Sequence, residues 1–249
     1  MTPDAPADDY ADRAAAYAVH RPSYPPALVD FLADLTAQHT LAWDAGCGSG
    51  QLSVLLVARF ERVVATDASA GQLAHARRQP NVLYRRARAE TSGLPNGEVD
   101  LAVAAQAAHW FDLPAYYAEV RRVTRPGGVV ALVTYGRMTV GDDVDPVIGA
   151  FYEGVLGRYW SPERRHVEQG YRSLPFPFEE LAAPALEMRA DWSAAQVLAY
   201  VDTWSAVRAM VRAEGSGPLG AFRRDLSRAW RAGTVRRVTW PLAVRVGRA

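Results

Sequence analysis

The chain has 249 residues, of which 28 are basic and 27 acidic, so its formal net charge is +1. Hydrophobic residues make up 49% and charged residues 22%, which is typical of a globular protein and argues against disorder. The balanced charge argues against a nucleic-acid-binding protein. No apolar run reaches the ~18 residues that a membrane helix needs. We therefore expect neither nucleic acid nor a membrane as a partner.

Cysteine and lysine usage narrows the chemistry further. Cys47 is the single cysteine, which excludes an internal disulfide framework and a multi-cysteine zinc site. Every basic residue is arginine, so no lysine is present for a Schiff-base mechanism. Residues 1–17 are acidic and rich in alanine, unlike the basic and apolar start of a secretory signal. We expect a cytoplasmic protein without a bound metal.

In chain order, the first half alternates helix and strand patterns. Pro25 and Pro26 suit a helix start, and Leu28, Phe31 and Leu32 follow at helical spacing. Strands are predicted at 41–44, 63–67, 82–87, 99–105 and 129–135, and further helices after residue 50, at 69–79 and at 112–124. The segment 126–128, Pro-Gly-Gly, is expected to be a turn. This alternation predicts a Rossmann-like, doubly wound α/β sheet that is mostly parallel.

The second half has a different pattern. Aromatic residues, glycine and proline are frequent over 137–180. We expect a strand at 186–192, helices at 193–212 and 219–231, and an antiparallel C-terminal strand at 235–246. The expected organisation is a core with an N-terminal lid segment over 1–136, a helical cap insertion for the substrate with a late core strand over 137–233, and a C-terminal core strand over 234–249.

The strongest chemical signal is the run from Trp43 to Gly50, which follows a predicted strand. Its glycines let the backbone approach a ligand closely, and the amides of a following helix can hold an anionic group. The Gly-x-Gly-x-Gly spacing departs from the dinucleotide fingerprint at Gln51, and a P-loop would need a lysine. A tight turn without a ligand is the alternative, which we consider weaker because of the acidic residue described next.

Asp67 ends the second predicted strand, about twenty residues beyond the glycines. An acidic residue at this place can accept hydrogen bonds from both hydroxyls of a ribose. A lone aspartate is more often a surface cap. Its combination with the glycine run favours ribose binding.

These segments together resemble class I S-adenosylmethionine-dependent methyltransferases. The resemblance is carried by Asp44-Ala-Gly-Cys-Gly-Ser-Gly, Asp67, Ala89-Glu90 and Pro126-Gly-Gly, and it covers about residues 8–136. The segments 17–25, 106–112 and 203–205 also resemble the small-molecule group that includes trans-aconitate methyltransferase-like proteins. The resemblance implies S-adenosylmethionine as cofactor, S-adenosylhomocysteine as product and a small molecule as acceptor.

The resemblance also implies cofactor-binding residues by position. The glycines, Asp44 and Gln106 would lie at the methionine part, Asp67 at the ribose, and the remaining core residues near the adenine. An N-terminal segment would cover the cofactor, and Arg21 would pair with its carboxylate. The alternative for Arg21 is an ion pair on the protein surface. The alternative for Glu90 is that it is a solvated acidic residue of a loop without a role in binding. The full set is Tyr17, Arg21, Asp44, Gly46, Gly48, Gly50, Asp67, Ala68, Leu73, Ala89, Glu90 and Gln106.

His109 is the candidate catalytic residue, because a histidine at the carboxyl end of a strand can act as a general base near neutral pH. Since His-Trp recurs in the resembling group, a structural or cofactor-side role is the alternative. Cys47 is not expected to be a nucleophile, because it lies in the glycine turn without an evident base. In the cap, aromatic residues suit a planar acceptor, while Arg158, Arg164, Arg165, His166 and Arg172 suit an anionic one.

The favoured function is methyl transfer to a small molecule, with the methylated atom and the oligomeric state left open. One alternative keeps the fold for non-methylating chemistry, such as cyclisation in natural-product biosynthesis. Another is a non-catalytic partner protein that binds the cofactor. The glycine spacing argues against a dehydrogenase.

Overall fold

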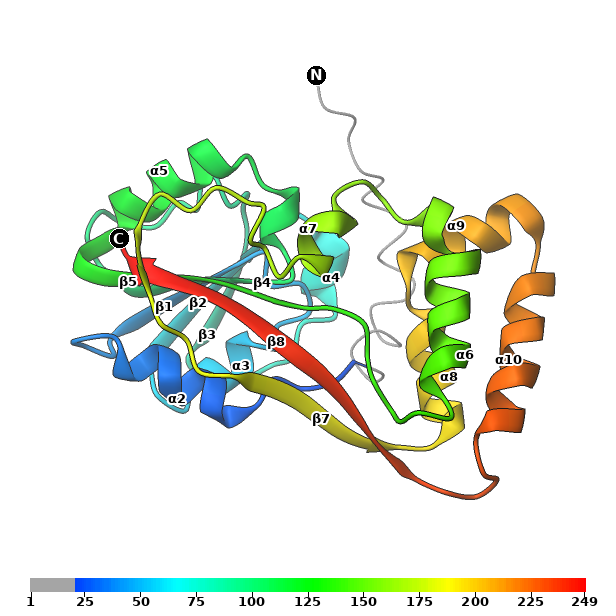
Figure 1. The fold of residues 1–249 in the computed structure, drawn as a ribbon. Coiled ribbons are helices and arrows are strands. Elements are labelled where there is room, and N and C mark those ends of the chain that lie inside the picture. The colour runs from blue at the N-terminus through cyan, green and yellow to red at the C-terminus, as the bar shows by residue number, and fades with distance from the viewer. Residues whose placement is uncertain (1–20) are drawn as a thin grey trace.

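The computed structural model describes residues 21–249, which form an eight-stranded sheet with helices around it (Figure 1). The strand order is β3-β2-β1-β4-β5-β8-β6, and β7 also pairs with β8. Strands β1 to β5 pair in parallel, whereas β8 is antiparallel to its neighbours. This confirms the predicted fold class. The strands are β1 Leu41–Ala45, β2 Arg62–Asp67, β3 Val82–Arg86, β4 Val99–Ala105, β5 Thr124–Tyr135, β6 Glu179–Leu181, β7 Leu186–Trp192 and β8 Arg236–Arg248.

The helices fall into two groups. Helices α2, α3 and α5 flank the sheet, while α6, α8, α9 and α10 gather beyond one of its ends (Figure 1). Among residues 21–249, no helix has the length and apolar character to cross a membrane. The helices are α2 Pro26–Asp34, α3 Ser53–Leu56, α4 Ala70–Ala74, η2 Ala108–Trp110, α5 Leu113–Val123, α6 Asp145–Gly149, η3 Ala150–Val155, η4 Gly157–Tyr159, α7 Arg164–Glu168, α8 Ala194–Asp202, α9 Ser205–Glu214 and α10 Gly217–Ala229.

Strand β1 divides its side chains between two cores, because successive side chains of a strand point to opposite faces. Leu41, Trp43 and Ala45 pack into the core beneath α5. Ala42 belongs to the other core, which continues from α2 into the helices α8, α9 and α10. The parallel strands end toward this helical group (Figure 1). The carboxyl ends of the strands and the cap helices therefore share one boundary, where α/β sheets place their ligands.

The helix expected over 69–79 is shorter than predicted. Helix α4 ends at Ala74, and its N-cap Ser69 accepts from the amide of Gln72 at 3.3 Å. Beyond it, the chain offers mainly polar side chains until Gln79, which precedes Pro80. The proline ring disfavours the helical conformation in the residue before it.

The single helix expected over 193–212 is wrong, because the chain forms α8 and α9 with a break between them. The amide and the hydroxyl of Thr203 both donate to the carbonyl of Tyr200, at 3.0 and 2.6 Å. Trp204 is extended, with ψ 136°, and is buried against the rings of Tyr152 and Tyr200. Packing of one indole therefore overrides the helical periodicity of the segment.

The Pro-Gly-Gly segment is an irregularity within a strand. Strand β5 begins at Thr124, which pairs with Val99, and the register shifts before the next pair. Gly127 has φ +76°, a conformation that glycine adopts without a steric cost. Strand β6 was not predicted, because its three residues are too few to show a period.

Candidate functional site

The glycine-rich loop lies at the carboxyl end of β1 and is held by the neighbouring strand. The amides of Gly46 and Cys47 donate to the carbonyl of Thr66 at 2.8 and 3.0 Å. The amide of Gly48 donates to Oδ2 of Asp67 at 2.8 Å. The loop and the acidic residue are thus one hydrogen-bonded unit, which their distance in the sequence did not reveal.

The loop glycines Gly46, Gly48 and Gly50 all have positive φ, at +69°, +55° and +78°, but their surroundings differ. A Cβ on Gly46 would lie 2.6 Å from the Cβ of Ala107, and a Cβ on Gly50 would overlap the hydroxyl of Tyr84. A Cβ on Gly48 would meet only Oε1 of Gln72, at 3.7 Å. Gly46 and Gly50 thus allow close internal packing, while the space above Gly48 is open to a ligand.

The loop does not lead directly into a long helix. Turns follow Gly50, and α3 covers only Ser53–Leu56. The helix after the loop is therefore shorter than expected, and a helix of four residues contributes only a weak dipole to the binding of an anionic group. The amides of Gly46, Cys47 and Gly48 already donate to Thr66 and Asp67, so they shape the loop and are not open donors for an anion.

Asp44 is almost completely buried, with 1% of its surface exposed. Its Oδ2 accepts from the hydroxyl of Ser53 at 2.6 Å, while its Oδ1 has no hydrogen-bond partner. Burial, together with the nearby Asp67, raises the pKa of Asp44 from 3.8 to about 7, against the lowering effect of the Ser53 hydrogen bond. An orphaned buried acceptor at the start of the glycine loop fits the cationic group of a ligand.

Asp67 accepts one backbone hydrogen bond at each carboxylate oxygen. Oδ2 accepts from Gly48, and Oδ1 accepts from the amide of Ser69 at 2.8 Å. Burial raises its pKa, and these two amides oppose the rise. An ionised carboxylate has about four lone-pair sites, so about two remain for a further pair of donors such as ribose hydroxyls.

The residues expected beside the adenine follow β2 and β3. Ala68 is exposed, Leu73 is partly buried on α4, and Ala89 is buried. Glu90 is held on both oxygens, by Nε of Arg88 at 3.1 Å and by the amide of Asp112 at 2.9 Å. Its carboxylate therefore has a structural role in joining two loops.

Gln106 follows β4 in the left-handed region, with φ +55°. Its side chain is fixed on both sides: Nε2 donates to the carbonyl of Tyr135 at 2.8 Å, and Oε1 accepts from Thr134 at 2.8 Å. Arg21 lies at the same strand end, donating to the hydroxyl of Tyr135 at 3.0 Å, with its guanidinium 5.5 Å from the ring of Tyr200. Tyr17 lies outside the described residues.

His109 lies on the η2 turn after β4. Its Nδ1 is 2.7 Å from the hydroxyl of Tyr171, a buried residue that sequence reasoning missed. Burial, and to a smaller extent the nearby Arg164 and His166, lowers the pKa of His109 from 6.5 to about 3. The imidazole is therefore neutral at neutral pH, and a general base with so low a pKa is weak.

Cys47 has the environment of an inert thiol. Burial raises its pKa, and the carboxylates of Asp44 and Asp67 raise it further. A thiol reacts as its thiolate, which these surroundings disfavour. This agrees with the expectation that Cys47 is not a nucleophile.

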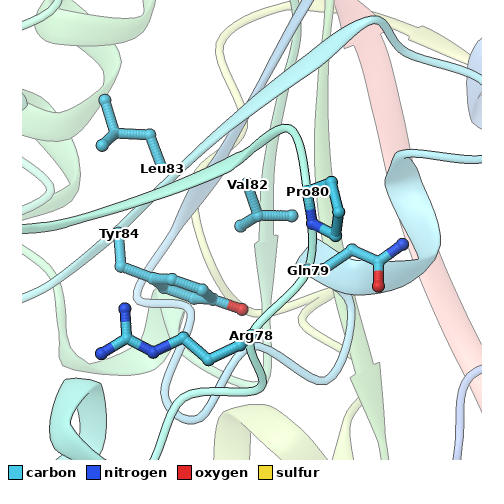
Figure 2. Close-up of a pocket in the computed structure, with 6 residues that line it drawn as sticks. All are labelled: Arg78, Gln79, Pro80, Val82, Leu83 and Tyr84. Atoms are coloured by element: carbon cyan, nitrogen blue, oxygen red, sulfur yellow. The ribbon is translucent and has the colours of Figure 1, made fainter.

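Figure 2 shows a surface pocket of about 330 Å³ on the outer edge strand β3, lined by Arg78, Gln79, Pro80, Val82, Leu83 and Tyr84. The hydroxyl of Tyr84 donates to the carbonyl of Arg77 at 2.8 Å and packs over Gly50. The pocket thus borders the glycine loop and contains none of the residues expected to bind the cofactor.

Comparison with known proteins agrees with this geometry. A methyltransferase domain family model matches residues 43–132. A protein of Dictyostelium discoideum named as a methyltransferase is 31% identical over 228 residues, which are 90% of this chain and 87% of that protein. A solved structure from Anaeromyxobacter dehalogenans, described as a type II methyltransferase, is 50% identical, with a TM-score of 0.87 over 92% of this chain and 97% of that one.

The fold, the glycine loop and these similarities define one class. The chain belongs to the class I S-adenosylmethionine-dependent methyltransferases, and it is an enzyme.

Proposed function

We propose that this enzyme transfers a methyl group from S-adenosylmethionine, bound at the glycine loop, to a small-molecule acceptor bound between the strand ends and the cap over 137–233. The observation that supports the cofactor site best is the partnerless, buried Oδ1 of Asp44, on the strand end that leads into the glycine loop. The methionine part of the cofactor carries an ammonium group, which such a carboxylate would hold.

The remaining cofactor contacts are assigned from the hydrogen-bonding groups that each residue has left and from its position. Asp67 has lone pairs left for the ribose hydroxyls, and Ala68, Leu73 and Ala89 would border the adenine. Gln106 would fix the strand end beside the methionine part. In this proposal Tyr17 and Arg21 belong to the segment that covers the cofactor, and Gly46, Gly48, Gly50 and Glu90 shape its cradle.

The bound cofactor would supply an activated methyl group. The protein then has to hold the acceptor in line and exclude water, and such positioning is worth roughly 7–11 kcal/mol in favourable cases. His109 would contribute as a neutral hydrogen-bonding group at the strand end. We also place the protein in the cytoplasm, which the single cysteine supports.

Calorimetric titration of the purified protein with S-adenosylmethionine and S-adenosylhomocysteine tests the cofactor site, with NAD as the negative control. Asp67→Ala is expected to weaken binding by more than about tenfold, because each hydrogen bond to a charged acceptor is worth ~1.5–3 kcal/mol. Asp30→Ala, which removes an exposed carboxylate from α2, is the matched control. Equal affinities in all three proteins would contradict the ribose assignment.

Product analysis then separates methylation from the alternatives. Release of S-adenosylhomocysteine in step with a methylated product is the expected result. Conversion of an acceptor without S-adenosylhomocysteine would favour recruited chemistry, and cofactor binding without turnover would favour a non-catalytic partner. Each of these two outcomes would contradict the proposal.

A further inference from the structure

Arg164 lies where the sheet meets the cap. It is the first residue of α7, which packs against the η2 turn that carries His109 and against β5. Figure 1 shows α7 between the ends of the parallel strands and the cap helices. The Arg164 side chain is 23% exposed, so its guanidinium is largely enclosed at this boundary.

The guanidinium of Arg164 is held mainly by aromatic side chains. It lies 4.7 Å from the centre of the Trp160 ring and 5.6 Å from that of Tyr152, and its Nε donates to the Tyr152 hydroxyl at 2.9 Å. Glu168 is the one carboxylate in reach among residues 21–249, at 3.9 Å from Nε, and it also accepts from Tyr152 at 3.0 Å. Within that part of the chain, neither terminal nitrogen of Arg164 donates a hydrogen bond.

The charge of Arg164 reaches side chains on several elements. It contributes to the low pKa of His109, and it opposes the rise that burial causes in the pKa of Tyr152, Tyr171 and Tyr200. These side chains come from η2, η3, the segment after α7 and α8. Arg164 therefore faces a region that the strand ends and the cap enclose together.

We propose that Arg164 binds an anionic oxygen group, a carboxylate or a phosphate, of the methyl acceptor. The planar guanidinium matches both groups, since it can donate two parallel hydrogen bonds to them. The rings of Trp160 and Tyr152 keep this fork oriented and stabilise its charge. This inference rests on the proposed function, because it places the anion in the proposed acceptor site next to His109.

The test uses benzoate and phenyl phosphate as probes, titrated at millimolar concentration into the protein saturated with S-adenosylhomocysteine and into the protein alone. Wild type is expected to bind at least one probe, and the preferred probe identifies the anion as carboxylate or phosphate. Arg164→Gln is expected to lower that affinity by at least about tenfold. Arg164→Lys keeps the positive charge but loses the planar guanidinium, and its affinity for the probe is expected to lie between those of wild type and Arg164→Gln.

Arg189→Gln is the control, because it removes an exposed arginine that lies on β7 and belongs to no proposed site. It is expected to bind the probe like wild type. Binding of neither probe to wild type, or equal affinity in Arg164→Gln and wild type, would overturn the proposal. Affinity for S-adenosylhomocysteine is expected to be unchanged in all variants. Failure of the wild-type protein to bind S-adenosylhomocysteine would contradict the proposed function instead. Should Arg164→Gln not fold, the lysine variant carries the same comparison.

Discussion

The hydroxyl of Tyr171 lies 2.7 Å from Nδ1 of His109 and joins the segment after α7 to the end of β4. Tyr171 is fully buried and has φ +61°, a conformation that is rare for a bulky residue. Arg245 on β8 holds the surrounding turn, donating to the carbonyls of Tyr171 and Leu174 at 3.1 and 2.7 Å. Three separate parts of the fold therefore combine to orient one imidazole.

Replacing Tyr171 by phenylalanine tests this orientation. The variant is expected to lose about 1 kcal/mol of unfolding free energy, the usual value of one hydrogen bond. It should also change the chemical shifts of the His109 ring nitrogens, because the partner of Nδ1 is gone. Denaturant unfolding and nitrogen NMR measure the two effects. Tyr159→Phe alters a hydroxyl on the cap surface, and it should leave the His109 signals as they are.

The low pKa of His109 predicts a pH dependence of stability. In the folded protein the pKa is about 3, against 6.5 in the unfolded chain, so below pH 6.5 protons bind preferentially to the unfolded state. The unfolding free energy should fall as the pH drops below 6.5, by at most about 1.4 kcal/mol per pH unit from this group. In denaturant unfolding, His109→Gln should lose less unfolding free energy than wild type between pH 6.5 and pH 4. Exposed His75→Gln should behave like wild type, and an identical slope in all three would refute the assignment.

Asp44 predicts a trade-off between stability and cofactor binding. Its pKa is raised from 3.8 to about 7, so its contribution to stability is present at low pH and is lost as the pH rises through 7. Asp44→Asn removes this loss, and thermal unfolding should show the variant gaining stability relative to wild type from pH 5 to pH 8. The same variant should bind S-adenosylmethionine more weakly at pH 8. A constant stability difference across this range would show that Asp44 does not titrate.

Gly50 and Gly97 form a matched pair for measuring the packing of the glycine loop. Both have positive φ, at +78° and +67°, but only Gly50 lies against a neighbour, Tyr84. Gly97→Ala should cost about 1–2 kcal/mol, the backbone penalty alone. Gly50→Ala should cost clearly more, and Tyr84→Ala in that background should recover part of the difference. If Gly50→Ala and Gly97→Ala lose equal unfolding free energy in denaturant unfolding, the Tyr84 side chain moves aside without a measurable cost.

Features that depend on local residue pattern could be predicted before the fold was known. Alternating strand and helix periods indicated the doubly wound sheet, because side-chain period reflects which face is buried. The run from Asp44 to Gly50 and the acid at Asp67 could be recognised, because backbone torsion and strand ends constrain residue type at short range. The resemblance to class I methyltransferases rested on these same segments, and it was confirmed.

Contacts between segments that are distant in the chain could not be predicted from local pattern. Tyr171 and His109 are 62 residues apart, and no local period indicates their hydrogen bond. The break before Trp204 came from its burial among aromatic rings, an energy that helix propensity does not contain. The raised pKa of Asp44 and the enclosed charge of Arg164 likewise arise from burial. Burial is a property of the packed chain, so these chemical properties could not be predicted without the three-dimensional structure.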